Sequence, residues 1–184
     1  MKIFALYLRL DLKDKPEWFD DLRNKYSSTS ILHITLIQPR YVNEGGIQIL
    51  KDKISEVLNK EKVEDKKLVF NKTKLEWDED DKEHLLMSFI QENQSVLNLQ
   101  KSLMEALKNF DKYCNESTKE YEANFRPHLT IANQINSSSK DEILKLISEN
   151  PTLEGDITDL VLAVVNEQTI QESENPNNWI TFNI

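Results

Sequence analysis

Apolar and polar residues alternate in short runs along the chain, and two of these runs carry the same four-residue pattern. Residues 33–36 read His-Ile-Thr-Leu, and residues 128–131 read His-Leu-Thr-Ile. Both lie in short apolar runs bounded by turn-forming residues, which predicts β-strands. Because successive side chains of a strand point to opposite faces, each His should share a face with its Thr while the aliphatic residues enter the core.

The spacing of apolar residues elsewhere predicts further strands and helices. Strands are expected at residues 2–10, 68–77, 85–90, 160–165 and 179–184. Helices are expected from Pro16 to residue 26, after Gly45-Gly46, from 94 to 110 and after Ser139, because apolar residues recur there every three or four positions.

The strands at 68–77 and 85–90 should form an antiparallel hairpin around an acidic turn at residues 78–82. Val69, Thr73, Leu75 and Trp77 are expected on one face of its first strand. The charged stretch 59–67 and the polar segment 111–124, with its acidic residues 116–122, are expected to be solvated connections.

The order of the predicted elements repeats in the two halves of the chain. In each half a strand and a helix precede the histidine strand, and a helix and a strand pair follow it. The two histidines, at positions 33 and 128, lie 95 positions apart, and the elements that follow are offset by about the same amount. This predicts an α+β fold with an internal duplication. Two pseudo-symmetric lobes would form one domain over residues 1–184 and face each other across a central cleft.

Composition and charge narrow the classes of partner. The chain has 184 residues, a single cysteine, Cys114, and a formal net charge of -9. One cysteine cannot form an intrachain disulfide, and no apolar run approaches the roughly 18 residues that span a bilayer. We therefore expect a cytoplasmic monomer with no membrane partner. A chain this acidic also lacks the positive field that long nucleic acids select, so a small anionic ligand in a locally basic pocket is favoured.

Two opposed imidazoles suit displacement at phosphorus. One histidine can act as a base behind the attacking hydroxyl, and the other as an acid behind the leaving oxygen. The two threonine hydroxyls could donate hydrogen bonds to the non-bridging phosphate oxygens, where charge accumulates. This chemistry needs no metal and no cofactor.

Both motifs, their spacing and the repeated order of elements resemble the two-histidine (2H) phosphoesterase superfamily, also called the 2'-5' RNA ligase or cyclic phosphodiesterase-like proteins. Pro127 before the second motif and the strand beginning at Ile3 add to the resemblance. It implies a bilobal fold of two antiparallel-rich sheets with outer helices. It also implies hydrolysis or formation of 2',3'-cyclic phosphates or 2'-5' phosphodiesters of a small nucleotide or short RNA end. His33 and His128 would be the acid and base, with Thr35 and Thr130 as phosphate ligands.

Three further residues are candidates for substrate binding. Members that resemble the RNA ligases often carry a basic residue soon after the second motif, where this chain has Asn133 and Gln134. Arg126, two residues before that motif, would project to the same face and supply positive charge instead. Arg40 and Tyr41 are candidates for the rim of the cleft, and the Tyr41 ring could stack on a base.

Two alternatives remain open. The histidines could bind zinc, although neither strand supplies a second ligand at a suitable spacing. The fold could also serve as a nucleotide-sequestering module with little turnover. Retention of both His and both Thr favours the enzyme, because binding alone would tolerate Asn or Lys in place of His.

Overall fold

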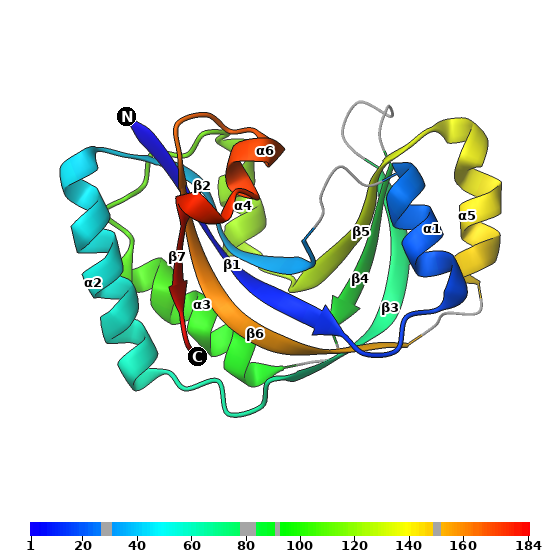
Figure 1. Cartoon of the computed structure of the whole chain (residues 1–184), viewed down its shortest axis with the longest axis horizontal. Helices are drawn as coiled ribbons and strands as arrows, with labels where there is room; N and C mark the ends of the chain where they lie inside the picture. Colours follow the sequence, from blue (N-terminus) through cyan, green and yellow to red (C-terminus); the bar gives the residue numbers. More distant parts are fainter. Residues whose placement is uncertain (27–30, 78–83, 91–92, 149–151) are drawn as a thin grey trace.

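The computed structural model describes residues 1–26, 31–77, 84–90, 93–148 and 152–184 (Figure 1). The predicted turn at 78–82 lies outside these residues. The strands are β1 (Lys2–Leu12), β2 (His33–Val42), β3 (Lys67–Trp77), β4 (His84–Ile90), β5 (His128–Ile135), β6 (Leu153–Val165) and β7 (Trp179–Phe182). The helices are α1 (Glu17–Tyr26), α2 (Glu44–Lys60), α3 (Gln94–Ala106), α4 (Ser117–Ala123), α5 (Lys140–Ile147) and α6 (Ile170–Ser173), with 3₁₀ turns at Ser137–Ser139 and Pro176–Asn178.

The strands form one antiparallel sheet in the order β2-β1-β6-β3-β4-β5, with β7 paired to β6. We call β2, β1, β6 and β7 the first limb and β3, β4 and β5 the second limb. The limbs join where Lys67–Phe70 pairs with Leu153–Asp156. The sheet curls so strongly that its two edge strands, β2 and β5, contact each other (Figure 1).

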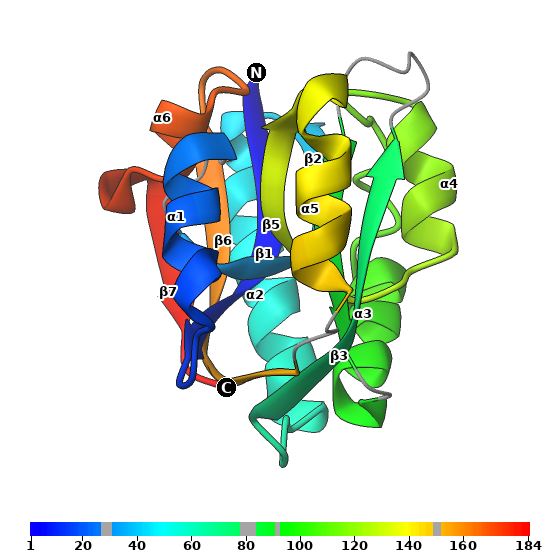
Figure 2. The same ribbon diagram turned by 90° about the vertical axis from the view of Figure 1, so that its right-hand side faces the viewer.

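Helices cover the outside of this curled sheet. α1 contacts β5 and α5 contacts β3, and both helices lie over the second limb (Figure 2). α2 and α3 pack against each other, and α3 also contacts β2. The predicted α+β class, antiparallel strands and outer helices are therefore confirmed, with the two sheets continuous as the limbs of one. The internal duplication stays a prediction.

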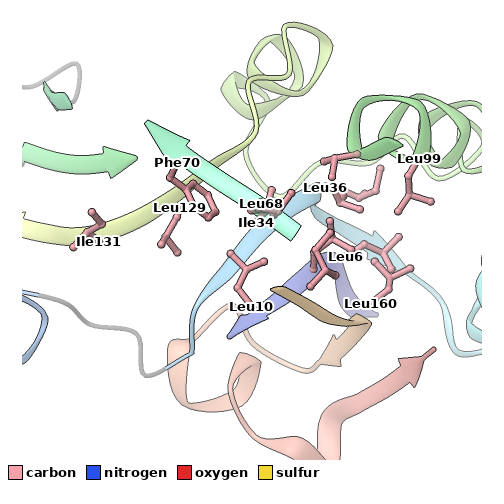
Figure 3. Packing of buried hydrophobic residues seen from close by; sticks show 14 of the residues in the cluster. Leu6, Leu10, Ile34, Leu36, Leu68, Phe70, Leu99, Leu129, Ile131 and Leu160 are labelled. Atoms are coloured by element: carbon pink, nitrogen blue, oxygen red, sulfur yellow. The ribbon is translucent and has the colours of Figure 1, made fainter. Parts of the chain in front are cut away.

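The two histidine motifs fold as strands because their aliphatic residues enter one shared core. Ile34 and Leu36 of β2 and Leu129 and Ile131 of β5 are buried in a single cluster (Figure 3). Burying an aliphatic side chain of this size contributes roughly 1.5–3 kcal/mol. The predicted alternation is confirmed in both motifs, since the neighbouring His and Thr residues are only half-buried on the other face.

The predicted core face of β3 is wrong at Val69, which lies before a β-bulge. The core residues at the start of this strand are Leu68 and Phe70, whereas Val69 is only half-buried. Phe70 pairs with Ile90 but Lys72 pairs with the adjacent Phe89, so Asn71 is an extra residue. A bulge of this kind reverses the alternation of faces, and Thr73 is consequently buried beyond it.

The polar segment at 111–124 contains a helix that the sequence analysis missed, and α3 ends at Ala106 rather than near residue 110. The prediction of a solvated turn at 116–122 is wrong, because α4 carries Glu122 into the interior. Among the helices that the structure describes, none has both the length and the apolar character needed to cross a membrane.

Glu122 meets Arg40 in a buried ion pair. The Arg40 and Glu122 side chains are 2% and 1% exposed, and Arg40 Nη2 lies 2.5 Å from Glu122 Oε2. Tyr113 donates its hydroxyl to the same carboxylate, and Arg40 also donates to the carbonyl of Phe110 at 2.9 Å. The prediction that Arg40 lies on the rim of a cleft is therefore wrong, because its guanidinium is enclosed and ties α4 to β2.

Replacing Arg40 by Met should lower the free energy of unfolding by about 3–5 kcal/mol, because it leaves a buried carboxylate without its cation. The double variant Arg40→Met/Glu122→Leu should lose less than the sum of the two single variants, since both charges are then absent. Urea denaturation measures these values. Lys108→Ala, which removes an exposed pair with Glu105, is the control and should change stability little. Similar losses for Arg40→Met and Lys108→Ala would contradict the prediction.

Candidate active site

The two histidine motifs occupy the two edges of the curled sheet. Thr35 pairs with Tyr7 of β1, and His128 and Thr130 pair with β4. The two edge strands contact each other, and charge on His128 lowers the pKa of His33 in addition to the larger effect of burial. The strands that carry the two histidines, which are 95 positions apart in the sequence, therefore lie side by side in the fold.

His33 is half-buried beside β1. Its ring packs at 5.1 Å from the ring of Tyr7, measured between centroids. Burial lowers the pKa of His33, because a charged imidazolium loses its hydration there; the Ile31 backbone and the Glu174 carboxylate oppose this in part. His33 is consequently biased toward the neutral imidazole, the form that accepts a proton.

His128 has its ring orientation fixed by two groups. Its Nδ1 lies 2.8 Å from the carbonyl oxygen of Arg126, which can only accept, so Nδ1 carries the proton. The Tyr121 hydroxyl lies 2.7 Å from Nδ1 and 3.0 Å from Nε2. With the proton on Nδ1, Nε2 carries the ring lone pair, and the Tyr121 hydroxyl can donate toward it. Burial lowers the pKa of His128 and raises that of Tyr121 to about 12, so the phenol keeps its proton at neutral pH.

Tyr121 was missed by the sequence analysis because α4 lies in a segment taken for a connection. Its only local signal is its position seven residues before His128, which shows no contact without the fold.

Arg23 is a second residue that the sequence analysis missed. It lies on the buried face of α1, four residues after Phe19, where an arginine interrupts the apolar stripe. Its Nη1 donates to the carbonyls of Thr130 at 3.4 Å and Ile131 at 3.3 Å. Its charge also lowers the pKa of His33. One cation from α1 therefore holds the second motif and acts electrostatically on the first.

A cavity of about 300 Å³ adjoins the first motif. His33 and Thr35 line it on one side, β1 and β6 line its floor, and residues 168–170 with Ser173 and Glu174 form its outer wall. The first motif therefore has room beside it for a group larger than a phosphate.

The remaining predicted binding residues lie at the surface. The Arg126 side chain is 56% exposed, and its Nη2 lies 3.5 Å from Glu76 Oε2. Tyr41 is 36% exposed and does not line the cavity. The roles of Arg126 and Tyr41 stay predictions. Over the described ranges, no three His, Cys, Asp or Glu residues are grouped so as to hold a metal ion.

Comparisons with known proteins agree with this architecture. Two solved structures of Usb1 from Kluyveromyces marxianus are similar in fold. One has a TM-score of 0.53 at 14% identity, and the other, with uridine monophosphate, has a TM-score of 0.56 at 12% identity. Each alignment covers 99% of this chain and 98% of the Usb1 chain. No curated protein sequence matches the chain.

The family model of the 2'-5' RNA ligase superfamily matches residues 11–169, a range that includes both histidine motifs, Arg23 and Tyr121. With most of its length matched and its fold shared with Usb1, the chain belongs to the 2'-5' RNA ligase superfamily of 2H phosphoesterases, enzymes that act on phosphodiester bonds.

Proposed function

We propose that the protein is a metal-independent phosphoesterase acting on a 2',3'-cyclic phosphate or a 2'-5' phosphodiester of a small nucleotide or RNA end. The observation that carries this proposal is that the two histidine strands, β2 and β5, are opposite edges of one sheet and contact each other. Each histidine has a threonine two residues on, with aliphatic residues between them buried. The uridine monophosphate in a structure of similar fold supports a nucleotide substrate.

Hydrolysis of a cyclic phosphate would use the two imidazoles in opposite protonation states. The neutral histidine takes a proton from water as the water oxygen bonds to phosphorus. The bond from phosphorus to one ribose oxygen breaks, and the protonated histidine gives its proton to that oxygen. Nε2 of His128 is the nitrogen available for this exchange, because Nδ1–H is held by the Arg126 carbonyl.

The surrounding residues would stabilise the phosphate charge. The Thr35 and Thr130 hydroxyls would donate to the non-bridging oxygens as negative charge grows there. Arg23 adds a positive charge near both motifs, and burial strengthens its field. A small substrate would meet this local positive charge and avoid most of the acidic surface.

Replacing either motif histidine by Ala should lower kcat by roughly a hundredfold or more, because each removes one proton-transfer step. A panel of 2',3'-cyclic nucleotides and 2'-5' dinucleotides, assayed in a chelator, provides the measurement. His84→Ala is the matched control, since this third histidine lies in β4 outside both motifs, and it should retain activity. Nucleotide binding by the native chain without any turnover would instead favour the sequestering module, and activity restored only by a divalent ion would favour zinc.

The pH profile of kcat/KM should be bell-shaped with its maximum on the acidic side of pH 6.5. Burial is the main cause that lowers the pKa of both His33 and His128, so both are deprotonated earlier as pH rises. The active form has one protonated and one neutral histidine. Above the two pKa values it loses its proton, and below them its neutral histidine gains one. Initial rates at subsaturating substrate across pH 4.5 to 8.5 report on the free enzyme. A maximum above pH 7, or a profile with a single limb, would contradict the assignment of His33 and His128 as an acid and base with lowered pKa values.

Thr35→Val and Thr130→Val should each lower kcat/KM by about tenfold, less than the histidine variants, because each removes one hydrogen bond to a charged oxygen. Thr181→Val, in the exposed position of β7, is the matched control and should behave as the native chain. Steady-state kinetics with one cyclic nucleotide suffices. Full activity in both motif variants would show that the threonines do not bind the phosphate.

A further inference from the structure

The cavity beside His33 is lined partly by residues outside the range that the family model matches. The match covers residues 11–169, whereas Ile3, Ala5 and Tyr7 on one side and Ile170, Ser173 and Glu174 on the other lie beyond it. The family match therefore does not describe Glu174 and six other lining residues, and the ligand of this cavity is inferred from the chemistry of its lining.

The outer wall of the cavity is held in a defined position. The carbonyl of Ser173 accepts hydrogen bonds from the Tyr7 hydroxyl at 3.3 Å and from Trp179 Nε1 at 2.7 Å. These bonds tie the end of α6 to β1 and β7. The carboxylate of Glu172 accepts from the backbone of Asn166 at 2.6 Å, which fixes the start of the same segment. The wall is thus built into the fold, and a ligand would not have to order it.

The lining offers apolar surface, the side chains of Gln38, Gln168 and Thr169, which can donate as well as accept, and one carboxylate. Ile3, Ala5, Ala163, Val165 and Ile170 supply the apolar part. Among the described residues, the lining contains no Lys or Arg, and Glu174 is its only carboxylate. An ionised carboxylate accepts hydrogen bonds and repels anions. Away from His33 and Thr35, the cavity is therefore unsuited to a phosphate, and its Glu174 wall is suited to a neutral, flat group that donates a hydrogen bond.

The cavity and the phosphate site share residues. His33 and Thr35 line the cavity and also belong to the proposed catalytic group. A nucleotide with its phosphate at the histidines would thus place its base beside the Glu174 wall. The volume of about 300 Å³ lies at the lower end of the range for ligand pockets, which fits one nucleoside.

We propose that this cavity is a nucleobase pocket selective for bases with an exocyclic amino group, cytosine or adenine, and that Glu174 is the specificity-determining residue. The amino group would donate to the Glu174 carboxylate, whereas uracil and hypoxanthine present a carbonyl oxygen at the same place and meet repulsion. The placement of the base rests on the proposed function, while the preference for donor-bearing bases rests on the cavity itself.

Two matched substrate pairs test the proposal on the full chain. Cytidine and uridine 2',3'-cyclic phosphates differ at one exocyclic group, as do the adenosine and inosine analogues. The kcat/KM ratio in favour of the amino-bearing member should be about tenfold or more in at least one pair, the size expected for one charge-assisted hydrogen bond. In Glu174→Gln that ratio should fall toward one, because an amide can both donate and accept.

The ratio within a pair is the appropriate readout, because Glu174 also raises the pKa of His33 and its removal will change absolute rates. Glu167→Gln is the control, since it removes an exposed carboxylate before α6 that does not line the cavity, and it should keep the native ratio. Ratios near one for both pairs in the native chain, or a ratio unchanged in Glu174→Gln, would overturn the proposal.

Equilibrium binding of the nucleosides separates this outcome from failure of the proposed function. Cytidine should bind more tightly than uridine, or adenosine more tightly than inosine, in titrations of the full chain, and Glu174→Gln should abolish the difference. Selective binding without turnover of any phosphate ester would contradict the catalytic proposal and support the pocket. Turnover with no selectivity in rate or binding would contradict the pocket and leave the catalytic proposal standing.

Discussion

The site depends on the short junction that joins the two limbs of the sheet. Only the segment Lys67–Phe70 of β3 pairs with β6, and the sheet turns there so that its edges meet. Gly155 lies within this junction and pairs with both Leu12 and Leu68. A Cβ at this position would come within 2.8 Å of the Asp11 carbonyl oxygen, so the backbones approach more closely than a side chain allows. The approach of the two histidines follows from this curl.

Local pattern was enough to predict the parts of the site that lie on strands. His33 and Thr35 share a face because Ile34 and Leu36 are driven into the core, and the same alternation operates in the second motif. Such alternation is visible within four residues. The strand order was harder to predict from the sequence, since pairing between β3 and β6 joins segments more than eighty positions apart.

The residues that the sequence did not reveal depend on contacts between distant segments. Arg40 looked like a rim residue because it follows the first motif, yet α4 brings Glu122 to it and encloses the pair. α4 also brings Tyr121 to His128. Arg23 reaches the second motif from α1, more than a hundred positions away. In each case nothing in the local sequence marks the polar residue, and its role depends on the partner that the fold brings to it.

The central claim is that the curl of the sheet brings His33 and His128 into one site. NMR titration of the histidine rings in the native chain and in His128→Gln tests it most directly. Burial is the main cause of the lowered pKa of His33, and charge on His128 lowers it further, so removal of that charge should raise the pKa of His33 while His84→Gln should leave it unchanged. A His33 titration that is the same in the native chain and in His128→Gln would contradict the claim.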